Sequence, residues 1–91
     1  MARGRRLWGF DDSERDVLVE ATAHIPTLRT VVARAARRTE FGGVWLVQAS
    51  VGELDEMYSL VEALMDATRS RKRRDQLEGM LASLCTSIDG F

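Results

Sequence analysis

The chain has 91 residues, of which 45% are hydrophobic and 30% charged, and its formal net charge is −1. This composition is typical of a single folded globular domain, here residues 1–91, and excludes a disordered chain or a dedicated DNA-coating protein. The longest apolar run, residues 44–47, is far shorter than the ~20 residues of a membrane-spanning helix. The basic start lacks the apolar segment of a secretory signal, and a single cysteine fits a reducing compartment, so we expect a cytoplasmic protein.

The first part of the chain predicts an arm, residues 1–10, followed by two helices over residues 11–40. Asp11 or Ser13 can cap the first helix, since each is followed by an acid three positions later. Pro26 lacks an N–H group and disfavours helical geometry in the residue before it, so the first helix must break there. Proline suits the first position of a second helix, whose apolar spacing continues up to two consecutive glycines.

Residues 43–49 predict a short buried strand, because apolar, β-branched and aromatic residues occupy both of its faces. A lone strand leaves its backbone groups without hydrogen bonds. It must therefore pair either with residues 6–10 or with its own copy across a dimer axis.

Residues 51–68 and 71–89 predict a helical hairpin. Ser50 and Glu53 have the spacing of a capping box at its start. The apolar stripes of the two segments are out of phase near Ser70, which favours a tight turn with Ser70 as the second N-cap. One long helix is the alternative, because no proline or glycine interrupts this stretch. The expected fold is a mainly α, small helical domain with a kinked or broken N-terminal helix pair, one short strand and a C-terminal antiparallel helical hairpin.

A basic cluster marks the turn of this hairpin. It consists of Arg69, Arg71, Lys72, Arg73 and Arg74. We expect these cations to pair with nearby carboxylates, for example Arg71 with Asp75 and Arg74 with Glu78 at helical spacing. The alternative is an anion or nucleic-acid site, because the cations lie beside the unpaired N–H groups of a helix start.

The two helices around Pro26 loosely resemble a helix-turn-helix, and the second of them is basic. Proline stands in the break where glycine is usual, and no Asn, Gln or Ser begins the second helix to contact base edges. We therefore interpret the arginines of this helix as a solvated face.

No arrangement of residues in the sequence predicts catalysis. The only histidine, His24, is expected to cap the end of the first helix, and Cys85 falls in an apolar stripe as a core thiol. No zinc spacing, phosphate loop or nucleophile with a neighbouring base is present. We expect no catalytic residue, no metal and no cofactor, and hence no enzyme.

The large aromatic and apolar residues near the strand are the candidate partner-binding surface. They are Phe41, Trp45, Val47 and Trp8. A domain of this size often depends on oligomerisation, which favours a homodimer. Twelve arginines against one lysine suggest the G+C-rich codons of a bacterial or phage genome. The sequence thus predicts a non-catalytic regulatory or adaptor protein that self-associates and binds a protein partner, and the alternative is a nucleic-acid-binding regulator using residues 69–74.

Overall fold

The computed structural model describes residues 5–89, except the side chain of Phe41. Its elements in chain order are β1 (Arg5–Phe10), α1 (Asp12–Ala21), α2 (Pro26–Arg34), β2 (Ala36–Arg38), the 3-10 turn η1 (Thr39–Phe41), β3 (Val44–Ser50), α3 (Val51–Ala67) and α4 (Arg71–Asp89). The chain is mostly helical in this region, with a three-stranded antiparallel sheet and a packed pair of C-terminal helices.

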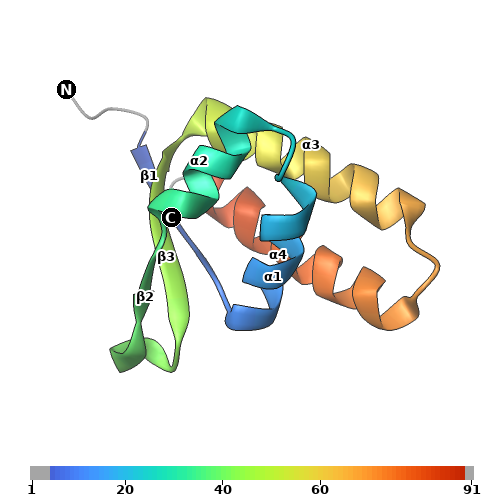
Figure 1. Cartoon of the computed structure of the whole chain (residues 1–91), viewed down its shortest axis with the longest axis horizontal. Coiled ribbons are helices and arrows are strands. Elements are labelled where there is room, and N and C mark those ends of the chain that lie inside the picture. The colour runs from blue at the N-terminus through green and yellow to red at the C-terminus, as the bar shows by residue number, and fades with distance from the viewer. Residues whose placement is uncertain (1–4, 90–91) are drawn as a thin grey trace.

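The sheet has the strand order β1-β3-β2, so the central strand β3 pairs with an element on each side. Trp8 of β1 lies opposite Val47 of β3, and Ala36 of β2 lies opposite Leu46 of β3. The helices lie to one side of the sheet, which forms the left wall of the molecule in Figure 1. The sheet therefore has an inner face against the helices and an outer face that the described elements leave uncovered.

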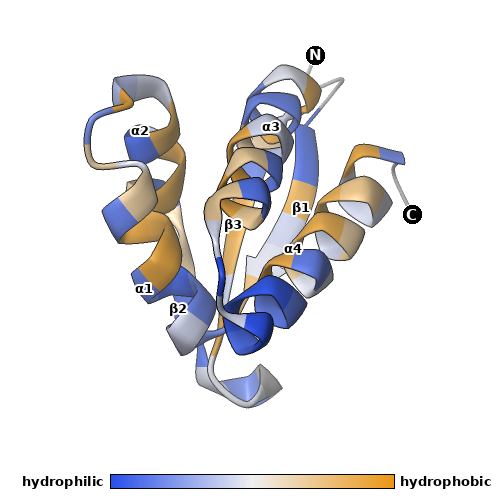
Figure 2. Ribbon diagram, turned by 90° about the vertical axis from the view of Figure 1, so that its right-hand side faces the viewer, coloured by the Kyte–Doolittle hydropathy of each residue, from blue (hydrophilic) through white to orange (hydrophobic). Residues whose placement is uncertain are grey.

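The core lies between the inner face of the sheet and all four helices. It contains Trp8, Phe10, Leu18, Leu28, Val31, Val32, Val47, Ala49, Leu54, Met57, Val61, Leu77, Met80 and Leu84. The apolar residues of each helix recur every three or four positions and so form the stripe that faces this core, as Figure 2 shows for α4.

The N-terminal helix pair is broken at Pro26, as the sequence predicts. Of the two predicted caps the Asp11 box forms, with the Asp11 carboxylate accepting from the Glu14 N–H at 2.8 Å. α1 ends at Ala21, and the carbonyl of its C-cap residue Thr22 accepts from the N–H of Ile25 at 2.9 Å; α2 begins at Pro26. Four residues, 22–25, thus separate the two helices.

The predictions for β-structure were incomplete in two places. Residues 5–10, expected as part of an arm, form β1, which is one of the two pairing partners considered for the strand. The second helix was expected to continue to the glycines but ends at Arg34, and residues 36–38 form the edge strand β2. The local preference of this Ala- and Arg-rich stretch for helix is overridden because the backbone of β3 needs a second partner. The fold therefore has three strands instead of one short strand.

The C-terminal hairpin is confirmed. Ser50 accepts from the Glu53 N–H at 3.1 Å while the Glu53 carboxylate accepts from the Ser50 N–H at 2.9 Å. Ser70 caps α4 by accepting from the Arg73 N–H at 3.2 Å, so the turn occupies residues 68–70. In the described part of the chain no helix is long and apolar enough to cross a membrane.

Candidate nucleic-acid interface

The outer face of α2 is the first candidate surface. Leu28, Val31 and Val32 point into the core. The opposite face is exposed, and its residues are Thr27, Arg29, Thr30, Ala33 and Arg34. Because α2 lies after a four-residue turn and is packed on one side only, it presents basic and hydroxyl side chains to solvent along its whole length.

A hairpin follows α2 directly and carries two more arginines. β2 and β3 are joined through η1 and two glycines in left-handed geometry, Gly42 with φ 75° and Gly43 with φ 83°. A Cβ on Gly43 would come within 2.6 Å of Nη2 of Arg37, so a side chain there would meet both backbone strain and the arginine. Glycine at this position lets Arg37 lie across the turn.

Asp12, the first residue of α1, fixes the hairpin to the helix pair. Its carboxylate accepts from Arg37 Nε at 3.1 Å and Nη2 at 2.9 Å, and from the Trp45 indole N–H at 2.7 Å. Arg15 covers the Trp45 ring, with its guanidinium carbon 4.1 Å from the ring centroid. The hydrogen bonds from Arg37 and Trp45 lower the pKa of Asp12 from 3.8 to about 2. No local pattern in the sequence predicts this cluster, because only the sheet register brings residues 12, 37 and 45 together.

A second ion pair joins α2 to α3. Arg34 Nη2 lies 3.1 Å from Glu53 Oε1 and also donates to the Gln48 carbonyl at 2.9 Å. The hydrogen bond from Arg34 and that from the Ser50 N–H lower the pKa of Glu53. The donors of Arg34 therefore largely bind groups of the protein itself, and Arg29 is the cation on α2 that can contact a ligand.

The basic cluster at the hairpin turn has different surroundings. None of Arg69, Arg71, Lys72, Arg73 and Arg74 forms an ion pair within residues 5–89. The pairing of Arg71 with Asp75 and of Arg74 with Glu78 was therefore wrong; Arg74 instead donates to the Thr68 carbonyl at 3.4 Å. Arg69, Arg71, Arg74 and Asp75 line a hollow of about 350 Å³ beside the first turn of α4. Its charge and the N–H groups of the helix start suit a phosphate.

The predicted partner-binding residues lie mostly inside the molecule. Trp8 and Val47 are 1% and 3% exposed, and the Trp8 indole donates to Ser83 Oγ at 2.9 Å. Trp45 is half-buried and engaged by Asp12 and Arg15. The Phe41 side chain lies outside the described residues. The structure thus places Trp8, Trp45 and Val47 in the sheet, and neither Trp8 nor Val47 is exposed to a partner.

The residues considered for catalysis do not assemble into a site. Cys85 is exposed and not a core thiol, because the buried side of α4 follows Leu77, Met80 and Leu84 and residue 85 lies one step around the helix from it. His24 is exposed in the turn between α1 and α2, and the expectation that it caps the first helix was wrong, because Thr22 is the C-cap. Over the described ranges, no three His, Cys, Asp or Glu side chains are close enough to hold a metal ion.

Comparison with known proteins finds no relative of this chain. No family model, no curated protein sequence and no solved structure matches the chain.

Proposed function

We propose that this chain is a non-catalytic, DNA-binding regulator that places α2 in the major groove of duplex DNA. The observation that carries the proposal is the order α1, four-residue turn, α2, hairpin, with the outer face of α2 uncovered. In helix-turn-helix proteins the second helix enters the major groove and the first crosses the backbone. The resemblance is one of architecture, and the contacts to DNA depend on the side chains that α2 presents.

The exposed residues of α2 are of the types that contact base edges. Arg29 is a bidentate donor of the kind that recognises guanine. The Thr27 and Thr30 hydroxyls donate to Glu56 and to the Pro26 carbonyl, so these side chains offer their methyl groups and their oxygens as acceptors. Arg38 on β2 is exposed, and its closest carboxylate contact, 3.8 Å from Glu40, is long. The strand register places it beside Val44 on the outer face of the sheet, so it does not belong to the groups of α2 that face the groove.

The near-zero net charge of the chain limits non-specific attraction to DNA. Acids on α1 and α3 offset the arginines, so affinity must come from local groups and not from the overall charge. The basic cluster at the hairpin turn supplies five cations without carboxylate partners in the described region. We propose that they bind backbone phosphates, which strengthens binding without selecting sequence.

The test is selection of bound sequences from a random duplex library, followed by fluorescence anisotropy at several salt concentrations. Arg29→Ala/Thr30→Ala should abolish the preference for the selected sequence and keep the weak non-specific binding. Arg71→Glu/Lys72→Glu should weaken binding to all duplexes alike and reduce the salt slope by about one for each phosphate that the variant no longer neutralises. Glu78→Ala, an exposed change on the same helix, is the control. No enriched sequence and no binding at low salt would overturn the proposal.

Self-association is a second candidate function, favoured by the outer face of the sheet. Leu7 is 59% exposed there, and the strand register places it on the same face as Leu46 and Val44. The structure leaves this face without a covering helix (Figure 1). A second copy of the chain is the fitting occupant, because paired helix-turn-helix units bind two half-sites of one duplex.

Leu7→Glu tests this candidate by sedimentation, since it charges the face without touching the core. A concentration-dependent dimer should become a monomer in the variant. Trp45→Ala is less informative, because it also removes the hydrogen bond to Asp12. A wild-type protein that stays monomeric at all concentrations would reject the candidate.

A further inference from the structure

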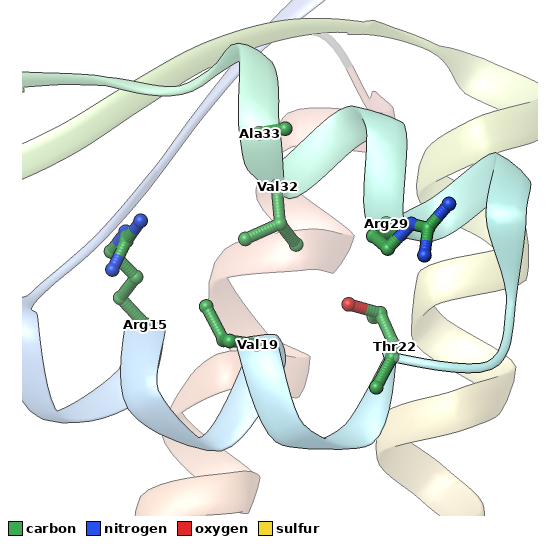
Figure 3. Close-up of a pocket in the computed structure, with 7 residues that line it drawn as sticks. Arg15, Val19, Thr22, Arg29, Val32 and Ala33 are labelled. Carbon is green, nitrogen blue, oxygen red and sulfur yellow. The ribbon is translucent and has the colours of Figure 1, made fainter.

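A cleft of about 320 Å³ opens between α1 and α2, and the core residue Val32 lines it. Figure 3 shows Val19 and Val32 facing one another across it, with Arg15 and Arg29 at its two ends. Its lining residues are Arg15, Val19, Thr22, Ala23, Arg29, Val32 and Ala33. The volume lies at the small end of the range for pockets that bind organic molecules.

The middle of the cleft is apolar. Val19 is 44% exposed, whereas Val32 on the opposite side of the cleft is 3% exposed and belongs to the core. The Thr22 hydroxyl donates to the Leu18 carbonyl at 2.7 Å, so its hydrogen is not available to the cleft. An occupant of the middle therefore gains by burying hydrocarbon, and a purely polar molecule would find few partners there.

The ends of the cleft are cationic. Arg29 makes neither an ion pair nor a side-chain hydrogen bond with any residue in the range 5–89. Arg15 has its guanidinium over the Trp45 ring, and its Nε is buried without an acceptor among the described residues. Among the described residues no Asp or Glu lines the cleft. Asp12, which accepts from the Trp45 indole, partly offsets the charge of Arg15 from outside the cleft, so Arg29 is the end without a neighbouring carboxylate partner in the range 5–89.

We infer that this cleft binds an amphipathic carboxylate, that is, a small acid with an aliphatic or aromatic body. The body lies between Val19 and Val32, and the carboxylate accepts hydrogen bonds from Arg29 or from Arg15, at the two ends of the cleft. A guanidinium and a carboxylate form charge-assisted hydrogen bonds, and the planar fork of arginine fits both oxygens. The charge at the ends selects this chemistry over a neutral apolar ligand.

Occupancy of the cleft affects DNA binding if α2 is the recognition helix; this step rests on the proposed function. Arg29 serves both surfaces, so a carboxylate on Arg29 competes with a base or phosphate for the same N–H groups. The ligand then lowers the affinity for DNA, and DNA lowers the affinity for the ligand by the same factor.

The experiment measures binding to the protein without DNA, by amide chemical shifts in a titration. Octanoate is the probe, 1-octanol provides the chain without the charge, and acetate provides the charge without the chain. We expect saturable shifts at Val19, Ala23 and Ala33, and affinity for octanoate at least about tenfold above that for either control probe, as one charge-assisted hydrogen bond gives. Equal affinity for octanoate and 1-octanol, or no shifts at these residues, would overturn the inference.

Two variants localise the site. Val19→Asp places a negative charge at the exposed mouth and should abolish octanoate binding, while Arg29→Gln should lower it about tenfold and leave 1-octanol unaffected. Arg5→Gln, an exposed change on β1 outside the cleft, should bind as the wild type does; equal binding by all three variants would contradict the site. Because these measurements contain no DNA, they can succeed where the DNA proposal fails, and the reverse also holds.

Discussion

Arginines are used differently in the two halves of this molecule. In the N-terminal half, Arg34 and Arg37 each join one element to another through a carboxylate. At the turn between α3 and α4 the basic residues have no such partners in the described region, and apolar side chains hold the two helices together. Arg34 and Arg37 therefore serve the architecture of the first half, where Arg29 alone on α2 stays available, whereas the whole cluster at the hairpin turn is available to a ligand.

The largest effect on stability should come from truncating a buried apolar side chain between α3 and α4. Leu77 is fully buried, so Leu77→Ala should lower the free energy of unfolding by about 2–5 kcal/mol, depending on how far the cavity relaxes. Glu78→Ala, one residue later and exposed, should change it by no more than about 0.5 kcal/mol. Urea unfolding measures both. Equal changes in the free energy of unfolding for the two variants would mean that the buried apolar contacts do not stabilise the hairpin.

The next largest effect should come from the turn that Arg37 crosses. Gly43→Ala should cost roughly 2 kcal/mol, since the alanine must adopt positive φ and displace the Arg37 guanidinium. Gly42→Ala has the same kind of φ with open space around its Cβ, and should cost about 1 kcal/mol. If thermal unfolding gave the two variants the same stability, the arginine would not be held across the turn.

The same charge reversal should act in opposite directions in the two halves. Arg34→Glu removes the ion pair with Glu53 and places a second carboxylate next to the Glu53 carboxylate. The repulsion should destabilise the protein by roughly 1 kcal/mol at this half-exposed site. Lys72→Glu places an acid in the first turn of α4 and should stabilise it by about 0.3–1 kcal/mol. Chemical unfolding at low salt measures both changes. Destabilisation by Lys72→Glu would show that the lysine side chain makes a contact that stabilises the folded state.

The smallest effect should be the pH dependence of the contact between Asp12 and Arg37. The folded-state pKa of Asp12 is about 2, below its ordinary 3.8, so its contribution to stability is complete above about pH 4 and is lost as the pH falls toward 2. The stability difference between the wild type and Asp12→Asn should close over this interval. Thermal unfolding from pH 2 to 6 measures it, and a difference independent of pH would mean that the carboxylate makes no such contact.

Local signals in the sequence were sufficient for the starts of the helices and for the hairpin turn, but not for the end of α2 or for the sheet. The capping pairs, Pro26 and the phase change near Ser70 act within a few residues, and each marks an observed helix boundary. β2 has no local signal, because residues 36–38 become a strand only when β3 offers an edge. The candidate sites have the same limitation: the contact of Asp12 with Arg37, and the cleft shared by α1 and α2, depend on how the elements pack.

The direct passage from β3 into α3 restricts where the chain can change in length. Ser50 is both the last residue of β3 and the N-cap of α3, so no linker absorbs an insertion. One added residue there would rotate α3 by roughly 100° about its axis and turn Leu54, Met57 and Val61 away from the core. Variants of this protein that differ in length should therefore differ in residues 39–43 or 68–70, where the backbone turns at the surface.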